Sequence, residues 1–200
     1  MKLRQSYYLE ADVTKIARDL IGKALFTNFE GAVCGGIIIE TEAYAGIRDK
    51  ASHAYAGKRT LRTRVMYQSG GVAYVYLCYG IHSLFNIVTG PVEVPDAVLI
   101  RGILATHGLE SIRQRLADTP FNNGFICGPG RVSKALRINK NHTGTDLAGE
   151  LIWLEDTGLS IDHHKIMCTP RIGIAYAEED AQLPYRFIIS PQKAEDLMAN

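Results

Sequence analysis

The sequence has few cysteines and no long apolar run, and both absences limit what the protein can be. Its four cysteines, Cys34, Cys78, Cys127 and Cys168, lie 41 to 49 residues apart, with no Cys-x-x-Cys pair to begin a metal site. We therefore expect four reduced cysteines, mostly in the core, and no bound metal. No apolar run approaches the roughly 18 residues of a membrane span, and residues 1–10 lack the apolar stretch of a signal peptide. The expected location is the cytoplasm, without a membrane partner.

Motifs of several enzyme classes are missing too. There is no glycine-rich phosphate loop, no Gly-x-Ser-x-Gly turn and no Cys–His signature, so we expect no cofactor. What is present is an ordinary globular composition, with 46% hydrophobic and 22% charged residues in a chain of 200. This composition excludes disordered, collagen-like and coiled-coil proteins and provides enough chain for a real core. Because no repeat, low-complexity tract or linker interrupts it, we predict a single domain over residues 1–200.

Net charge is also nearly absent, since the formal charge is +1, which mildly disfavours a nucleic-acid partner. The total conceals an asymmetry, because residues 1–140 hold 18 basic and 11 acidic side chains and residues 141–200 hold 4 and 10. Residues 48–64 carry six basic side chains against Asp49 alone: Arg48, Lys50, Lys58, Arg59, Arg62 and Arg64. Charge alone favours a solvated loop here, and the alternative is a strip that faces phosphates.

Hydrophobic spacing predicts short helices and strands. Asp12 as an N-cap, apolar residues at helical spacing and Gly22 after the end indicate a helix at residues 13–20, and further helices are expected at 108–117 and after Gly128. Strand-like runs occupy residues 37–44, 72–78, 81–88, 97–103, 151–154, 171–176 and 186–189. The second and third runs are separated only by Tyr79 and Gly80, which predicts a tight hairpin.

One of these strands carries two carboxylates near its end. An extended backbone places Glu40, Glu42 and Tyr44 on one face, successive residues being roughly 6.5 Å apart. A carboxylate that follows a buried apolar run loses hydration, which raises its pKa and suits a general base. The alternative is that both glutamates pair with nearby Arg or Lys side chains. The six residues Ile39-Glu40-Thr41-Glu42-Ala43-Tyr44 alone leave the general-base and the ion-pair interpretations equally open.

Aromatic side chains gather around the predicted hairpin. We assign Tyr74 and Phe85 to the core, whereas Tyr79 at the tip is exposed unless it inserts into something. Aromatic residues beside a basic loop are typical of proteins that unstack nucleic-acid bases. His53 in that loop is more often a surface residue than a catalytic one, and Arg101, where an apolar run ends, could orient a carboxylate or a phosphate.

Six motifs follow one another along the chain at characteristic spacing. They are Glu40-Thr41-Glu42-Ala43-Tyr44, Ala51-Ser52-His53, Ala73-Tyr74-Val75-Tyr76-Leu77-Cys78-Tyr79-Gly80, Asn86, Val98-Leu99-Ile100-Arg101 and Cys127-Gly128-Pro129. In this order they closely resemble the alkyladenine (3-methyladenine) DNA glycosylase family, and the resemblance reaches from the first helix to Pro184-Tyr185-Arg186-Phe187. It implies a mixed α/β (α+β) fold, a single domain with a curved antiparallel sheet, a protruding β-hairpin and flanking helices.

The resemblance also implies an activity. The chain is expected to be a monofunctional enzyme that flips alkylated or deaminated purines out of duplex DNA and hydrolyses the N-glycosidic bond. Glu42 corresponds to the general base that activates water, and Arg101 to the residue that holds the water and Glu42 in place. Glu40 is left as a structural carboxylate bonded to backbone or to a basic side chain. No lysine nucleophile is required, so no strand nicking is expected.

Further residues match the family's recognition positions. By this resemblance, Tyr44 and Tyr76 stack on the flipped purine, and His53 offers it a hydrogen-bonding edge. Tyr79 resembles the residue that wedges into the DNA in place of the extruded nucleotide, and Asn86 the one that crowds the exocyclic amine of guanine. Phosphate contacts are expected from four loop residues, Lys58, Arg59, Arg62 and Arg64.

The expected partner is double-stranded DNA that contains damaged purines, bound by a monomer in the cytoplasm, at the nucleoid if the cell is bacterial. Because the chain is nearly neutral, its DNA affinity should be modest and fall steeply with salt. Two other functions stay open. One is a non-catalytic damage-binding module with the same pocket, and the other a small carbohydrate hydrolase that uses Glu40 and Glu42, which the basic loop and Tyr79 disfavour.

Overall fold

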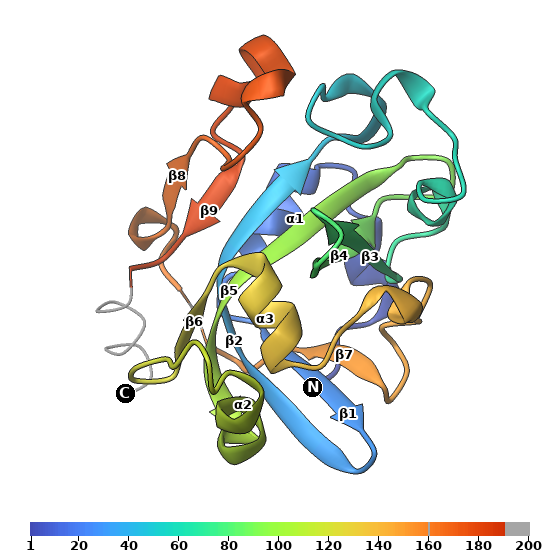
Figure 1. Cartoon of the computed structure of the whole chain (residues 1–200). Coiled ribbons are helices and arrows are strands. Elements are labelled where there is room, and N and C mark those ends of the chain that lie inside the picture. The colour runs from blue at the N-terminus through green and yellow to red at the C-terminus, as the bar shows by residue number, and fades with distance from the viewer. Residues whose placement is uncertain (160, 191–200) are drawn as a thin grey trace.

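The protein, described here by a computed structural model over residues 1–159 and 161–190, is built on a curved antiparallel sheet (Figure 1). The sheet order is β3-β4-β5-β2-β1-β7, with β6 beside β5 and the β8–β9 pair beside β2. The strands are β1 (Ala24–Phe29), β2 (Ala32–Tyr44), β3 (Ala73–Cys78), β4 (His82–Thr89), β5 (Asp96–His107), β6 (Phe125–Cys127), β7 (Ile152–Glu155), β8 (Met167–Thr169) and β9 (Arg186–Ile188). The predicted mixed α/β fold is confirmed. The end of the predicted domain, residues 191–200, lies outside the described residues.

Within the described ranges, three short α-helices flank the sheet, namely α1 (Val13–Asp19), α2 (Leu109–Arg115) and α3 (Pro129–Ala135). The predicted N-cap of α1 is confirmed, because the Asp12 side chain accepts hydrogen bonds from the backbone N–H groups of Thr14 and Lys15. Short 3₁₀ segments of three to eight residues occupy Gln5–Leu9, Gly46–Arg48, Tyr55–Gly57, Arg64–Tyr67, Lys140–His142, His163–Lys165 and Ala175–Gln182. None of the helices in the described ranges has the length and apolarity needed to cross a bilayer.

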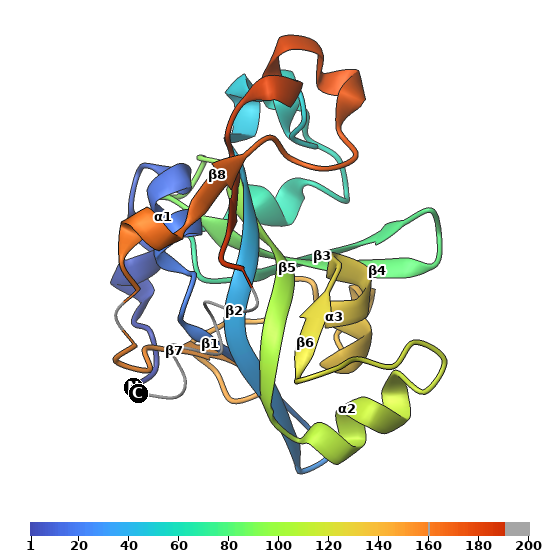
Figure 2. The same cartoon turned by 90° about the vertical axis from the view of Figure 1, so that its left-hand side faces the viewer.

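Strands β2 and β5 form the long curved centre of the sheet (Figure 2). Strand β2 begins at Ala32, five residues before the predicted start, and contains Gly35 and Gly36 in its interior. Both glycines are needed there for close approach. A Cβ on Gly35 would lie 2.2 Å from Cδ1 of Phe26, and one on Gly36 would lie 2.3 Å from the carbonyl oxygen of Leu104. The β2–β5 register also shifts on either side of Glu40.

The predicted hairpin is confirmed as β3 and β4, and Figure 2 shows it projecting from the sheet. Its tip has positive φ angles at two consecutive residues, 50° at Tyr79 and 74° at Gly80, and the N–H of Ile81 donates to the carbonyl of Cys78. This conformation suits the right-handed twist of the two strands. Tyr74 and Phe85, expected in the core, are both buried.

Two expectations are wrong. Residues 171–176 do not form a strand, because the chain bends there and continues into a 3₁₀ turn, and the N–H of Ile172 bonds to a side chain instead of a neighbouring strand. The four cysteines are free, but only Cys34 is buried, while Cys78 is half-buried and Cys127 and Cys168 are exposed. The last two are exposed because they lie on the short edge strands β6 and β8.

Candidate active site

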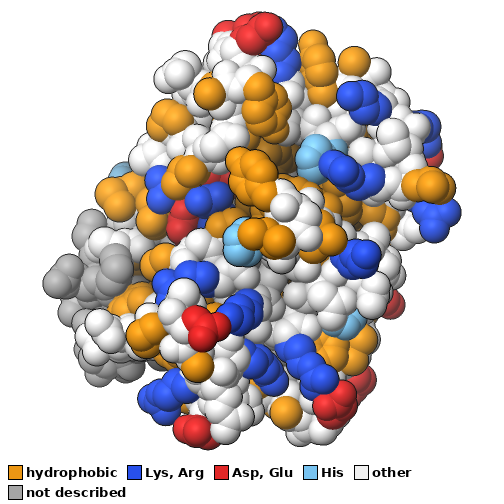
Figure 3. All heavy atoms as spheres, viewed as in Figure 1, with side chains coloured by type: hydrophobic (Ala, Val, Ile, Leu, Met, Phe, Trp, Pro, Cys, Tyr) orange, Lys and Arg blue, Asp and Glu red, His pale blue; other side chains and the backbone are white. Residues whose placement is uncertain are grey.

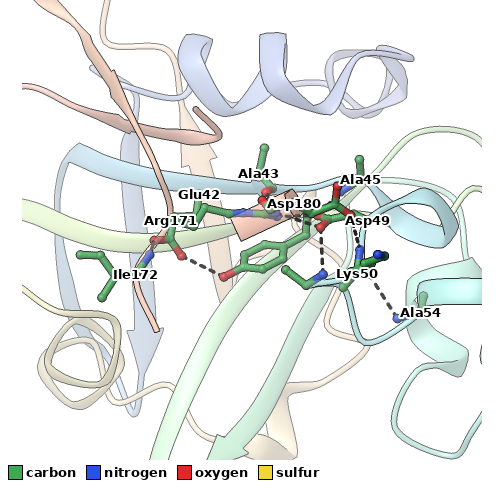
Figure 4. A network of polar contacts seen from close by, with 12 residues as sticks. Glu42, Ala43, Ala45, Asp49, Lys50, Ala54, Arg171, Ile172 and Asp180 are labelled. Carbon is green, nitrogen blue, oxygen red and sulfur yellow. Dashed lines mark hydrogen bonds and ion pairs between the residues drawn. The ribbon is translucent and has the colours of Figure 1, made fainter. Parts of the chain in front are cut away.

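The carboxylate of Glu42 lies at the centre of the sheet, between β5 and β9, and its side chain has no exposed surface. Its Oε2 accepts a hydrogen bond of 2.9 Å from the Tyr44 hydroxyl and one of 3.4 Å from Nη1 of Arg101. Its Oε1 accepts a hydrogen bond of 2.8 Å from the backbone N–H of Ile172 (Figure 4). Both oxygens are therefore held, which fixes the orientation of the carboxylate.

Burial raises the pKa of Glu42, because the charged form loses hydration. The Arg101 guanidinium is the largest opposing influence, followed by the hydrogen bonds from Ile172 and Tyr44. A carboxylate held in this way is ionised less readily than an exposed one but has well-defined partners. These are the properties of a carboxyl group prepared to take a proton from a molecule in the adjoining cleft.

The neighbouring Glu40 has different partners. Its Oε1 accepts hydrogen bonds from Nε of Arg101 at 2.9 Å and from Nε of Arg186 at 2.7 Å. Arg101 therefore bridges Glu40 and Glu42. The expectation that Glu40 is a structural carboxylate bonded to a basic side chain is confirmed. The predicted pairing of both glutamates with a basic side chain is confirmed, because each pairs with Arg101. Glu42 is also buried, and its role as a general base stays a prediction.

A cleft of about 810 Å³ opens beside Glu42. Six of the predicted site residues line it, although they are scattered over β2, β3, β4, β5, the hairpin tip and the basic loop: Tyr44, His53, Tyr76, Tyr79, Asn86 and Arg101. Glu42 is not among the lining residues, but the three residues that bond to it, Tyr44, Arg101 and Ile172, all line the cleft. Figure 3 shows this face of the molecule with hydrophobic and histidine side chains toward its centre and Lys and Arg side chains around them.

His53 is half-buried in the wall of the cleft instead of lying on the surface. Its Nδ1 lies 2.7 Å from the Tyr74 hydroxyl, and its ring meets the Tyr76 ring edge to face, with centroids 4.6 Å apart. Burial lowers the pKa of His53, and the cations Arg62 and Lys58 lower it further. A neutral imidazole whose Nδ1 is engaged can bond to a ligand only through Nε2.

Asn86 is buried on β4, with its amide directed at backbone carbonyl groups. Its Nδ2 donates to the carbonyl oxygens of Tyr74 at 3.1 Å and of Leu84 at 3.2 Å. Because an amide nitrogen has two hydrogens, both donors are used. The atom of Asn86 that can still bond to a ligand is therefore the acceptor Oδ1.

Tyr79 at the tip of the hairpin is 92% exposed, and it also borders the cleft. The adjacent Ile81 is 73% exposed. The side chains of Tyr79 and Ile81 therefore project into solvent from the hairpin that protrudes from the sheet (Figure 2). They could be buried only by contact with another molecule.

The four predicted phosphate-binding residues are all exposed, but they differ in their partners. Arg59 forms an ion pair with Glu93, and its guanidinium lies over the Tyr67 ring at 3.8 Å from the centroid. Lys58 and Arg62 lie on the same loop as His53, and their charges lower the pKa of His53. No contact of Arg64 bears on the cleft.

Sequence reasoning missed several residues of this region. Arg131 and Lys134 on α3 line the cleft, as does Tyr176, which is 66% exposed and donates its hydroxyl hydrogen to the carbonyl of Ala51. Arg171 was treated only as the first residue of an expected strand. The signal that could have identified it is a cation at the border of an apolar run: Arg171 stands where such a run begins, and Arg101 drew attention where one ends.

Metal chemistry has no evident site in this region. Within residues 1–159 and 161–190, no group of three or more His, Cys, Asp or Glu side chains could hold a metal ion. The chemistry that the described side chains offer is a buried carboxylate, an arginine beside it and aromatic surfaces facing the cleft.

Comparisons with known proteins show which family the chain belongs to. The sequence model of the methylpurine-DNA glycosylase family matches residues 7–193. A protein of Chlamydia felis, named "Putative 3-methyladenine DNA glycosylase", is 42% identical over 196 residues, covering 98% of this chain and 100% of its own length. Proteins of the same name from Desulfitobacterium hafniense and Clostridium perfringens are each 38% identical, covering 94% and 96% of this chain and 95% and 98% of their own. The chain therefore belongs to the methylpurine-DNA glycosylase family.

Proposed function

We propose that the protein is a monofunctional DNA glycosylase that removes alkylated or deaminated purines, of the 3-methyladenine, hypoxanthine and ethenoadenine class, from duplex DNA. The observation that carries the proposal is the placement of Glu42, a buried carboxylate fixed at both oxygens beside an aromatic-lined cleft. The names of the relatives, which specify 3-methyladenine, support the alkylated purines among these substrates. The product is an abasic site.

The cleft recognises a purine that has left the base stack. Tyr44 and Tyr76 offer ring faces, which attract a cationic base such as 3-methyladenine through cation–π interactions. His53 bonds to an edge of the base through Nε2, and Asn86, whose amide donors are both used, faces it with an acceptor. The amide also narrows the space available for the exocyclic amine of guanine.

Extrusion of the nucleotide costs a few kcal/mol of lost stacking and pairing. The exposed Tyr79 ring offsets part of this cost by entering the DNA in place of the extruded nucleotide. Because the hairpin carries Tyr79 away from the body of the protein, the ring reaches the duplex while the purine occupies the cleft.

Hydrolysis then requires one water molecule. Its oxygen forms a bond to C1′ while the N-glycosidic bond breaks, and the bonding electron pair leaves with the purine. Glu42 accepts the proton from the water and stabilises the positive charge that develops on the sugar. Arg101 holds Glu42 from the cleft side. No protein amine attacks C1′, so the reaction ends at the abasic site without strand cleavage.

The DNA backbone is held by basic side chains around the cleft. Lys58, Arg62 and Arg64 contact phosphates. Arg59 can do so only when its ion pair with Glu93 breaks. These contacts position the enzyme without reading the sequence. We further propose that the protein acts as a monomer, in the cytoplasm where its DNA substrate lies.

A second candidate function is a damage-binding module without catalysis. One observation favours it, namely that the Glu42 side chain has no exposed surface from which to meet a water molecule. The carbohydrate hydrolase, by contrast, needs two available carboxyl groups, and Glu40 is held by two arginines.

Single-turnover base release distinguishes the two candidate functions. The substrates are duplexes that contain hypoxanthine, ethenoadenine or methylated purines, and each abasic site formed is detected as a strand break after alkali treatment. We expect wild type to release the base and Glu42→Gln to bind the same DNA with release lowered by at least about a thousandfold. Breaks that form without alkali would contradict a monofunctional enzyme. If wild type binds DNA only when a lesion is present but releases no base from any duplex, the protein is a damage-binding module and not an enzyme.

A further inference from the structure

A buried ion pair between Arg171 and Asp49 lies behind the site (Figure 4). Both guanidinium terminal nitrogens donate to the Asp49 carboxylate, Nη2 to Oδ1 at 2.8 Å and Nη1 to Oδ2. The same nitrogens donate to the carbonyl oxygens of Ala43 at 2.8 Å and of Asp180 at 3.2 Å. The Arg171 side chain is fully buried, so every one of these bonds is made away from bulk solvent.

The contacts of Arg171 reach two of the three groups that bond to Glu42, namely the Ile172 N–H and the Tyr44 side chain. Arg171 precedes Ile172, whose N–H donates to Glu42 Oε1, so fixing the arginine fixes the donor. Ala43, whose carbonyl accepts from Arg171, stands between Glu42 and Tyr44 in β2. The guanidinium carbon also lies over the Tyr44 ring, at 4.8 Å from its centroid.

Asp49 extends the connection to the start of the basic loop. Its Oδ2 accepts from the N–H of Ala45 at 3.0 Å, and its Oδ1 from the N–H of Ala51 at 2.9 Å. His53 follows two residues after Ala51. The ion pair therefore joins the end of β2, the loop that carries His53 and the segment that begins at Arg171.

We infer that Arg171 and Asp49 act as a pair of positioning residues, which hold the Glu42 carboxylate and the Tyr44 ring in the geometry that base release requires. This inference rests on the proposed glycosylase function. Neither residue lines the cleft, so neither contacts the substrate. A buried ion pair contributes little to stability compared with apolar side chains of the same volume, which leaves geometry as the main effect of this one.

The test is single-turnover release of hypoxanthine at a series of enzyme concentrations by wild type, Arg171→Lys and Asp49→Asn. Lysine keeps the charge but cannot form the four hydrogen bonds, and asparagine keeps the shape but loses the charge. We expect the maximal rate constant to fall at least about tenfold in each variant, and the half-saturating enzyme concentration to change less than about threefold. The matched control is Arg137→Lys in the exposed pair with Glu30, which is expected to keep both values.

The saturating rate constant separates positioning from folding, because unfolded molecules lower the active fraction and leave that constant unchanged. Wild-type rate constants in both variants, with only the active fraction or the melting temperature reduced, would overturn the inference. So would a loss confined to the half-saturating concentration. If wild type releases no base from any lesion, the proposed function fails, and the inference fails with it. If wild type releases the base and both variants release it at the same maximal rate, only the inference is refuted.

Discussion

At the scale of single residues, the protein assigns different partners to two carboxylates on one strand. Glu40 is bonded to the Nε atoms of two arginines, whereas Glu42 is bonded to a hydroxyl, a backbone N–H and the far nitrogen of Arg101. The strand pattern identified both as candidates. Only their surroundings in the fold distinguish the two. Two arginines hold Glu40, whereas burial raises the pKa of Glu42.

A third carboxyl group, Asp96, gives a prediction for stability. Burial at the start of β5 raises the pKa of Asp96 to about 6, and Arg48 opposes this effect only in part. Because its pKa is higher in the folded than in the unfolded protein, Asp96 favours folding when protonated, and this contribution is lost as the pH rises through about 6. Asp96→Asn should remove that loss, which amounts to up to about 3 kcal/mol of unfolding free energy.

Urea unfolding at several pH values between about 4 and 7 measures this effect. The free energy of unfolding of the variant, relative to wild type, should increase across this range. Glu150→Gln, at a side chain that is 93% exposed, provides the control and should leave the pH dependence unchanged. Parallel curves for wild type and Asp96→Asn would show that Asp96 titrates alike in both states.

At the scale of secondary structure, irregularities of the sheet place the site. The register of β2 against β5 shifts on both sides of Glu40, and such bulges redirect side chains. Arg101 on β5 thereby reaches Glu40 and Glu42 together. The β3–β4 hairpin, by contrast, is regular up to its tip, where Tyr79 takes a positive φ that a large side chain rarely adopts.

Tyr79→Asn should therefore separate stability from function. Asparagine before glycine is the favoured pair for this type of turn, so the free energy of unfolding should stay the same or rise by up to about 1 kcal/mol. Base release should nevertheless slow, because the wedge is lost. Thermal unfolding and single-turnover release measure the two effects, and a variant that is both more stable and fully active would remove Tyr79 from the proposed mechanism.

At the scale of the whole molecule, a nearly neutral chain concentrates positive charge around one cleft. Arg131 and Lys134 line it, and Lys58 and Arg62 are exposed on the loop that carries His53. Lys50, Arg59 and Lys134, however, are paired with acidic side chains. The excess of basic residues in the first 140 positions therefore produces only a partial excess of positive charge on the face that carries the cleft. A substantial share of the basic loop is neutralised within the protein.

The salt dependence of DNA binding tests which cations meet phosphates. Arg62→Gln should reduce the slope of log affinity against log salt by about 1, since one phosphate contact is lost. Arg59→Gln should reduce it less, because Glu93 already neutralises Arg59. Fluorescence anisotropy with a lesion-containing duplex between about 50 and 200 mM salt gives the slopes. Equal slopes for wild type and Arg62→Gln would remove Arg62 from the phosphate-binding set.

The sequence by itself determined the features that depend on neighbours within a few residues. The cap at Asp12, the hairpin around Gly80 and the buried strand that leads to Glu42 all follow from local residue types. The ordered motifs are specific enough to indicate the family without the tertiary structure. The short edge strands were missed because three residues carry too little pattern to be recognised.

Only the tertiary structure decided which groups meet at the site. The N–H that orients Glu42 comes from Ile172, 130 residues away, and the partner of Arg171 is Asp49, 122 residues away. A backbone N–H has no residue-specific signal, since every residue except proline has one. The partner of a buried arginine is chosen by the path of the chain, because a charge removed from water is stable only where the fold brings an opposite charge to it.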